Sequence, residues 1–146
     1  MVKFLTADET LPLRSMVLRD GAPLNDCHFQ GDDAPGTFHM GYQSPDGAVV
    51  SILTCQSEPM EGYDGIGYRL RGMATHPDWR GKGVGSHLLL SAIEHLSTVV
   101  TADYLWCNAR RVAYDFYLHL GFDFVSGEFD IPNIGPHRVM YLMIDH

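Results

Sequence analysis

Residues 76–85, HPDWRGKGVG, place three glycines and two cations just ahead of an apolar run. Glycine has no Cβ and can adopt a positive φ, so its backbone N–H can approach a ligand closely. Several such N–H groups at the start of a helix bind anions, and the helix dipole strengthens the binding. Arg80 and Lys82 add positive charge beside them. The segment therefore predicts a cradle for phosphate groups.

Two common phosphate-binding patterns do not fit this segment. The P-loop pattern G-x-x-x-x-G-K-[ST] fails because Gly83 stands where Ser or Thr is required. The dinucleotide pattern G-x-G-x-x-G fails because Ser86 and Leu88 stand where its last glycine is required. The spacing that fits is [Arg/Gln]-x-x-Gly-x-[Gly/Ala], with Arg80, Gly83 and Gly85.

The composition limits the kind of protein that this chain can form. Its 146 residues, 45% of them hydrophobic, are enough for the core of one domain, which we expect to span residues 1–146. A net charge of −8 disfavours nucleic acid and favours cationic partners. No stretch approaches the roughly 18 apolar residues of a membrane span, and the N-terminus turns acidic too early for a signal peptide. We therefore expect a cytoplasmic protein with no nucleic-acid or membrane partner.

The cysteines and histidines show no metal-binding pattern. Cys27, Cys55 and Cys107 are odd in number and form no Cys-x-x-Cys pair. The eight histidines are scattered, without His-x-x-x-His spacing. We expect no metal. His39 and His137 remain candidates for a general base, because each lies beside a predicted strand that could border a cleft.

The elements that must position these residues alternate between strands and helices, which predicts an α/β fold with helices packed on a mixed sheet. Asp8 is expected to cap a first helix that carries Pro12 in its first turn. Residues 19–36 predict a long irregular loop with one helical turn, and such loops are often functional. The other predicted helices span about 83–96 and 111–120, and the predicted strands span 2–7, 37–43, 48–55, 65–75, 103–109, 122–129 and 137–144.

With these elements, the chain resembles the GNAT superfamily of acetyl-CoA-dependent N-acetyltransferases. MATHPDWRGKGVGSHLL is similar to the family's motif A, and LWCNARRVAYDFYLHLGF is similar to its motif B. The matched blocks cover residues 66 to 124. The segments LPLRSMVLR and IGPHRVMYL resemble, more weakly, an ElaA-like bacterial branch. The resemblance implies the GNAT fold: a mixed, mostly antiparallel central sheet, splayed in the middle, with helices on both faces.

The resemblance also implies a site for coenzyme A. Backbone N–H groups of the glycine loop would hold the pyrophosphate, and the end of the preceding strand would pair with the pantetheine arm. Asn108 would bond a pantetheine amide, although Arg110 stands where many relatives carry asparagine; a helix cap is the other reading of Asn108. The implied cofactor-binding residues are Met73, Ala74, Thr75, Arg80, Gly81, Lys82, Gly83, Val84, Gly85, Ser86 and Asn108.

Tyr117 and His137 are the residues predicted to act in catalysis. Tyr117 matches the family's general acid, which would protonate the departing thiolate; its alternative role is packing of the ring. Many relatives carry an acidic base on the motif A strand, where this chain has Arg69 and Arg71. A histidine or a water chain must then deprotonate the amine. His137 is our first choice, and its alternative role is packing against the last strand.

The function that this resemblance implies is transfer of an acetyl group from acetyl-CoA to a primary amine on a small molecule or a peptide. The amine would attack the thioester directly in a ternary complex, and Met73 N–H could stabilise the oxyanion. A covalent route through Cys107 is imaginable, and a non-catalytic acyl-CoA-binding sensor is the alternative from another class. The sequence leaves the acceptor open, with the 19–36 loop as one expected wall of its site. A homodimer is an option, because family members often form dimers.

Overall fold

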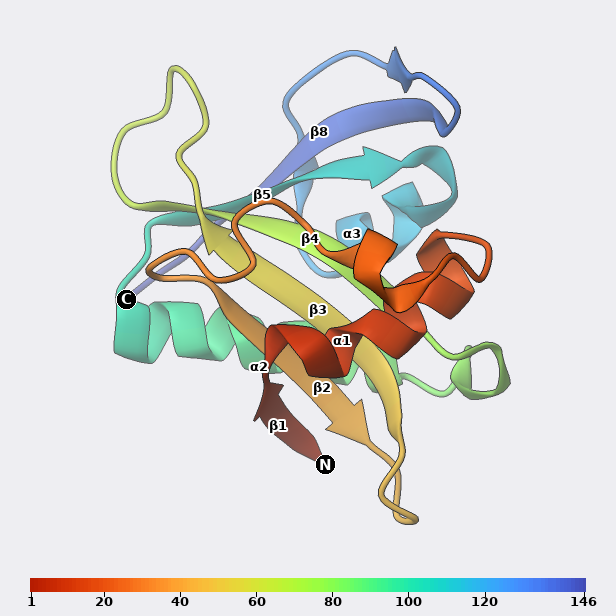
Figure 1. Ribbon diagram of the computed structural model, residues 1–146. Coiled ribbons are helices and arrows are strands. Elements are labelled where there is room, and N and C mark those ends of the chain that lie inside the picture. Colours follow the sequence, from red (N-terminus) through yellow and green to blue (C-terminus); the bar gives the residue numbers. More distant parts are fainter.

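The computed structural model describes residues 1–146 and contains one continuous sheet of eight strands (Figure 1). The strands are β1 (Val2–Leu5), β2 (Phe38–Gln43), β3 (Val49–Ser57), β4 (Gly67–Thr75), β5 (Tyr104–Arg110), β6 (Asp123–Phe124), β7 (Phe129–Ile131) and β8 (Gly135–Met143). Their order is β1-β2-β3-β4-β5-β8-β6, and β7 also pairs with β8. Every pair is antiparallel except β4 with β5, so the mixed, mostly antiparallel sheet implied by the resemblance is confirmed.

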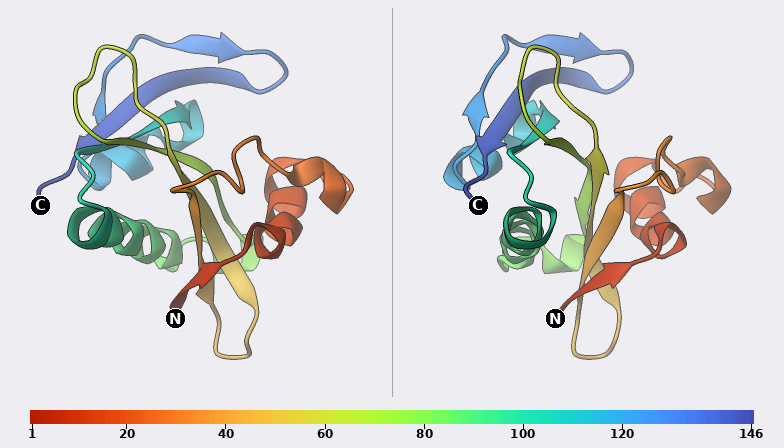
Figure 2. Two further views of the ribbon diagram at one scale, coloured as in Figure 1. Left: turned by 60° about the vertical axis from the view of Figure 1, so that its left-hand side comes forward. Right: turned by 90° about the vertical axis from the view of Figure 1, so that its left-hand side faces the viewer.

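Helices cover both faces of this sheet. The right-hand view of Figure 2 shows the N-terminal strands edge-on, with the first helix on one side and the long green helix on the other. None of the helices is long and apolar enough to span a membrane. The α-helices are α1 (Ala7–Leu13), α2 (Val84–His95) and α3 (Tyr114–His119); shorter helical turns span Arg14–Leu18, Leu24–Cys27, Pro77–Trp79, Leu96–Val100 and Arg111–Ala113.

The start of α1 differs from the expectation at two residues. Thr6, not Asp8, is the N-cap: its hydroxyl accepts from Glu9 N–H, and Glu9 Oε1 accepts from Thr6 N–H at 2.9 Å. This reciprocal capping box satisfies two free amide donors at once and ends β1 at Leu5. Pro12 lies in the second turn rather than the first. Because proline removes a helical hydrogen bond, the regular α-spacing soon gives way to π-spacing, from Arg14 onward.

The main core lies between the sheet and the pair of helices α2 and α3. The apolar stripe of α2 faces the sheet with Leu88, Leu89 and Ala92, and Leu96 of the following turn continues it; each of the four is fully buried. Seventeen buried residues form this cluster, which includes Cys55 and Cys107 as small apolar side chains. After α3 the chain reverses at Gly121, whose φ of +95° suits the glycine that commonly ends a helix.

The sheet divides in its middle, between β4 and β5. These parallel strands pair at only three positions, Gly67–Tyr104, Tyr68–Leu105 and Arg69–Trp106. Beyond them β4 continues to Thr75 and β5 to Arg110 without pairing to each other. The splay implied by the resemblance is therefore present, and it leaves two strand edges facing a gap.

A buried polar network anchors the loop that follows the first helical segment. Arg14, fully buried, makes two hydrogen bonds to the Asp32 carboxylate at 2.7 and 3.0 Å and a third to Thr54 Oγ1 at 2.9 Å. Thr54 Oγ1 lies 2.7 Å from His39 Nδ1, and His39 Nε2 lies 3.0 Å from the Asp32 carbonyl oxygen. A carbonyl can only accept, so His39 carries its proton on Nε2. The network joins the first helical segment, the loop, β2 and β3.

We expect Asp32→Asn to lower the free energy of unfolding by about 3–5 kcal/mol, because it leaves a buried arginine without its counter-charge. Burial raises the pKa of Asp32, but hydrogen bonds from Arg14 and from Phe29 N–H outweigh it, and the net pKa is lowered. The pair therefore stabilises fully above the unfolded pKa of about 3.9, and its contribution is lost as the pH falls through the lower folded value.

Denaturant unfolding at pH 7 and at acid pH measures both effects. The exposed neighbour Asp33, changed to Asn, is the matched control and should stay within about 0.5 kcal/mol of wild type. Equal stability of the Asp32 and Asp33 variants would contradict the role of the network.

Candidate active site

A β-bulge lies on β4 where the strand leaves its partner β5. Arg71 pairs with Thr54 and Ala74 with Ile52, so Gly72 and Met73 together face one residue of β3. Bulges bend a strand and leave a backbone group without its ladder partner. Gly72 has a φ of +61°, and a Cβ there would lie 2.5 Å from the Phe29 ring. Only glycine fits this position.

The glycine loop opens at the far end of β4, at the start of α2. Gly81 and Gly83 have φ values of +75° and +78°, and no atom lies within 4 Å of a Cβ built on either one. Gly83 is the N-cap of α2 without a side-chain cap bond. The first N–H groups of a helix have no partner inside the helix. They therefore face open space beside two exposed cations, Arg80 and Lys82, which is the geometry of an anion site.

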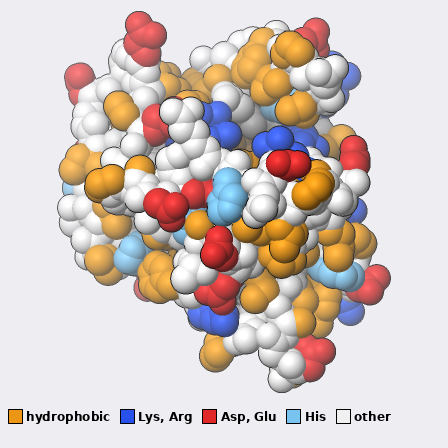
Figure 3. All heavy atoms as spheres, in the orientation of Figure 1, with side chains coloured by type: hydrophobic (Ala, Val, Ile, Leu, Met, Phe, Trp, Pro, Cys, Tyr) orange, Lys and Arg blue, Asp and Glu red, His pale blue; other side chains and the backbone are white.

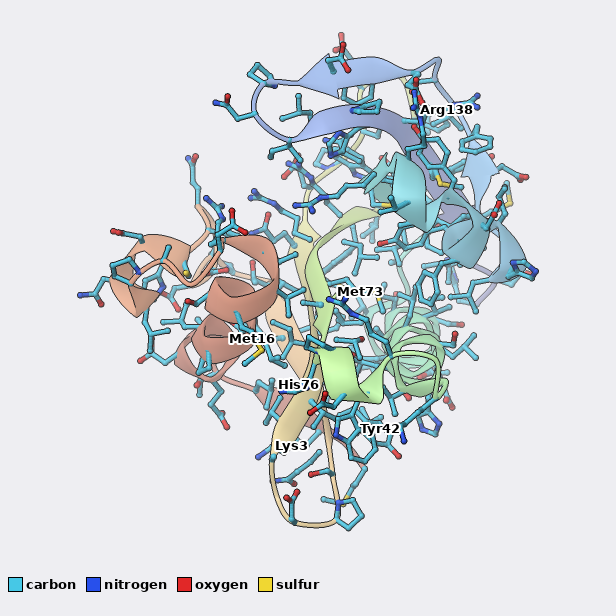
Figure 4. The ribbon with its side chains drawn as sticks, turned by 90° about the vertical axis from the view of Figure 1, so that its right-hand side faces the viewer. Lys3, Met16, Tyr42, Met73, His76 and Arg138 are labelled. Carbon is cyan, nitrogen blue, oxygen red and sulfur yellow. The ribbon has the colours of Figure 1, made fainter.

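Three elements converge at Gly85, in the first turn of α2. A Cβ there would lie 3.4 Å from Thr75 Oγ1, 3.5 Å from Met73 Cε and 3.9 Å from Phe116 Cζ. The end of β4, the start of α2 and α3 thus meet around one small residue. Figure 4 shows Met73 on the side of β4 that faces α2, away from α1.

The remaining predicted cofactor residues lie along the same path. Thr75 Oγ1 is 2.9 Å from Ser51 Oγ, and the side chain of Ala74 packs with Leu5, Leu13 and Ile52 under α1. Val84 is buried and Ser86 half-buried. The structure therefore gathers the predicted residues of β4 and the glycine loop into one continuous strip.

Asn108 lies on β5, two residues past the last pair with β4. It is half-buried, and its side chain makes no hydrogen bond within the chain. The helical turn after β5 has no side-chain cap. The alternative reading of Asn108 as a helix cap is therefore wrong, and its side-chain amide is free to bond a ligand.

Tyr117 projects from α3 into the core beside β5. Its ring packs against Phe116 and Phe122, each with a centroid distance of 5.2 Å. Burial raises the pKa of the phenol, and the nearby thiols of Cys107 and Cys55 raise it further. The hydroxyl makes no hydrogen bond within the chain, yet it is not sealed from solvent. Tyr117 is thus a neutral donor with an unused proton.

Cys107 does not have the chemistry that a covalent acetyl-enzyme needs. The residue is 2% exposed, and burial raises the pKa of its thiol to about 12, against a smaller opposing effect of Arg69. The thiolate is the nucleophilic form of cysteine. At neutral pH its population here is negligible, so the structure argues against the covalent route.

The two candidate bases differ in how their ring nitrogens are engaged. Both nitrogens of His39 are bonded inside the polar network, so His39 has a structural role. His137 pairs with Arg110 across β5 and β8 and stacks on Phe129. Its Nδ1 donates to the Gly135 carbonyl at 2.7 Å, which leaves Nε2 as the free acceptor in the neutral ring. His137 is 4% exposed.

A polar pocket that sequence reasoning did not identify opens on the α1 face of the divided sheet. It has a volume of about 320 Å³ and is bounded by the 19–36 loop and strands β3 and β4. Figure 3 shows Lys and Arg side chains gathered in the upper half of this face. A glutamate that the strand sequence alone did not reveal, Glu58, lies here and bonds to Arg69 at 3.3 Å. It follows β3 and reaches β4 only through sheet pairing, so no motif on β4 could reveal it. The lining includes Gln30, Thr37, Gln56, Glu58, Arg69 and Arg71.

Comparisons with known proteins agree with this geometry. A family model described as an acetyltransferase (GNAT) domain matches residues 38–123. YitI of Bacillus subtilis, an uncharacterised N-acetyltransferase, is 37% identical over 142 residues, which are 96% of this chain and 93% of that protein.

Solved structures show the same fold at low sequence identity. An aminoglycoside 6′-N-acetyltransferase complexed with coenzyme A has a TM-score of 0.76 and 13% identity, covering 100% of this chain and 98% of the other. ElaA of Escherichia coli has a TM-score of 0.76 and 18% identity, with 97% and 98% covered. The fold thus matches over the whole length, and the family model covers more than half of the chain. The chain belongs to the GNAT family of acetyltransferases.

Proposed function

We propose that this protein transfers an acetyl group from acetyl-CoA to a primary amine, which attacks the thioester directly in a ternary complex. One observation carries the proposal: an uncapped helix N-terminus with open glycine positions lies at the mouth of the β4–β5 gap. The uncapped helix N-terminus suits a diphosphate group, and the β4–β5 gap suits an extended pantetheine arm. Release of free thiol from acetyl-CoA, measured over a panel of amines, tests the function.

The residues present fit coenzyme A in three parts. The pyrophosphate would accept hydrogen bonds from N–H groups of Gly81, Lys82, Gly83, Val84, Gly85 and Ser86, with Arg80 beside them. The pantetheine arm would pair with the free edge of β4 at Met73, Ala74 and Thr75, and the Asn108 amide would bond it from β5. Acetyl-CoA supplies the activated acetyl group, and the chain supplies position and charge.

The catalytic roles follow from what each group can do. Met73 N–H, at the bulge, would stabilise negative charge that develops on the thioester oxygen. Tyr117 would donate its proton to the departing sulfur, a role that suits a phenol kept neutral by burial. A water chain or His137 Nε2 would accept the proton of the amine. No carboxylate of β4 takes this role, because Arg69 and Arg71 occupy the strand.

Coenzyme A should stabilise the wild-type protein and fail to stabilise Gly83→Val. At 100 times its dissociation constant a ligand adds about 2.7 kcal/mol, which corresponds to a rise in Tm of roughly 5–10 °C. A valine at φ +78° strains the loop and blocks the N–H groups. Thermal unfolding with and without coenzyme A measures the shift.

Gly62→Val is the matched control for Gly83→Val. Gly62 has a φ of +85° and nothing within 4 Å of a Cβ, so the substitution introduces similar strain away from the loop. Its coenzyme A shift should equal that of wild type. An undiminished shift in Gly83→Val would refute the assignment of the loop.

Tyr117→Phe should lower kcat by about 10²–10⁴-fold while coenzyme A affinity stays within a few-fold of wild type. The lost proton is needed mainly in the transition state, where the leaving sulfur carries charge. Steady-state kinetics and coenzyme A titration separate the two effects. Tyr114→Phe on the same helix, whose hydroxyl bonds to Glu128, should keep kcat. If Tyr117→Phe keeps the full kcat, then water rather than Tyr117 donates the proton to the departing sulfur.

His137→Ala should remove the acid limb of the kcat/KM profile against pH, leaving only the rise set by the amine's own ionisation near pH 10. Coenzyme A binding should survive, because the glycine loop lies on other elements. Glu58→Gln is measured in parallel. If the His137→Ala profile superimposes on that of wild type and the acid limb is lost in Glu58→Gln, then Glu58 rather than His137 is the general base.

A further inference from the structure

The polar pocket on the α1 face lies against β4 just before the bulge. Arg71 lines it and is two residues from Met73, about 7 Å along the strand. Of its nine lining residues, Ala34 alone is apolar. A volume of about 320 Å³ is at the lower end for small-molecule sites. The pocket therefore suits a small polar molecule held beside β4.

Arg71 is the charge in this pocket that lacks a partner. It makes no hydrogen bond and no ion pair within the chain; its guanidinium lies over the Phe29 ring, 4.7 Å from the centroid. Burial lowers the pKa of Arg71 and the charge of Arg69 lowers it further, and the net pKa stays lowered although the charges of Glu58 and Asp32 oppose this. The nearby carboxylates thus compensate the charged form of Arg71 only in part. A half-buried cation of this kind favours an incoming anion.

The nearby carboxylates are already engaged by other arginines. Asp32 is held by two hydrogen bonds from Arg14, and Glu58 is 3.3 Å from Arg69. Arg69 Nε is itself sealed from solvent without a partner. The pocket lining therefore carries two arginines and one glutamate, an excess of one positive charge in a chain with a net charge of −8.

We propose that the acceptor is a small amine that also bears a carboxylate, and that Arg71 binds this carboxylate. The planar guanidinium can make two parallel hydrogen bonds to a carboxylate, which fixes the direction of the acceptor as well as its position. With the carboxylate held at Arg71, the amine end extends along β4 toward Met73. The inference rests on the proposed acetyl transfer and names its acceptor class.

Matched acceptors test the charge directly. ω-Amino acids with one to five methylene groups are compared with their carboxamides and with the corresponding aminoalkylphosphonates, with thiol release as the readout. Wild type should favour at least one carboxylate over its carboxamide by about 10–100-fold in kcat/KM, the usual effect of a hydrogen bond to a charged group. A preference for the phosphonates over the carboxylates would mean that the pocket binds another anion, and it would overturn the assignment of a carboxylate.

Arg71→Gln should lose this preference by lowering kcat/KM for the carboxylate acceptor, while kcat/KM for the carboxamide, which no longer meets the charge of Arg71, does not fall. Arg71→Lys keeps the charge but cannot make the paired hydrogen bonds of a guanidinium, so its preference for the carboxylate should be intermediate. This variant replaces Arg71→Gln in the test if the glutamine variant folds poorly. Arg19→Gln is the matched control, because Arg19 is exposed and lies 5.7 Å from the same Phe29 ring, outside the pocket. Equal losses for both acceptors in Arg71→Gln would overturn the proposal.

Calorimetric titration of the same ω-amino acid into the coenzyme A complex separates failure of this inference from failure of the function. Binding that Arg71→Gln weakens at least 10-fold, without any thiol release, would retain the anion site and reject the transferase activity. Turnover of neutral amines without carboxylate preference would retain the activity and reject the anion site. If the ω-amino acid does not bind and is not preferred as an acceptor, the anion site is also rejected.

Discussion

The constraint on which the site depends is the short contact between β4 and β5. Parallel strands normally satisfy each other's backbone groups along their length, yet these two separate after three pairs. Their polar edges must then find other partners, because unpaired buried backbone groups are costly. The two halves share one core on the α2 face, to which Leu70 of β4 and Leu105 of β5 both belong. An extended ligand arm is the partner that such edges are shaped to accept.

The bulge and the buried polar network act together on the acceptor side of this gap. The Phe29 ring packs where a Cβ of Gly72 would be, and Arg14 lies 3.8 Å from its centroid. Arg14 also holds Asp32, and this fixes the loop that walls the pocket. The loop is irregular, yet it is attached to β2 and β3 through a chain of hydrogen bonds. The shape of the pocket therefore depends on a charge pair that lies outside motifs A and B.

Local patterns in the sequence sufficed for the elements and the glycine loop, because their signals lie within a few residues. The helix α2 and the strands β2 and β3 lie within two residues of the ranges predicted for them. The predicted N-cap of α1 was wrong because a competing local interaction, the Thr6–Glu9 capping box, makes Thr6 rather than Asp8 the N-cap residue of the helix. The pocket was not predictable, because Glu58 and Arg69 become neighbours only through sheet register.

The arginines on β4 change what the strand can do for the acceptor. A carboxylate on this strand would attract an ammonium group and could take its proton, whereas Arg69 and Arg71 repel a bare ammonium. A simple alkylamine is mostly protonated at neutral pH, so it would meet this repulsion as it approached β4. An acceptor whose own carboxylate neutralises Arg71 removes much of the repulsion and brings the amine in beside it. With the acceptor proposed above, Arg71 makes charge compensation by the substrate part of the binding step, which is consistent with the ion pairs that already engage the nearby carboxylates Asp32 and Glu58.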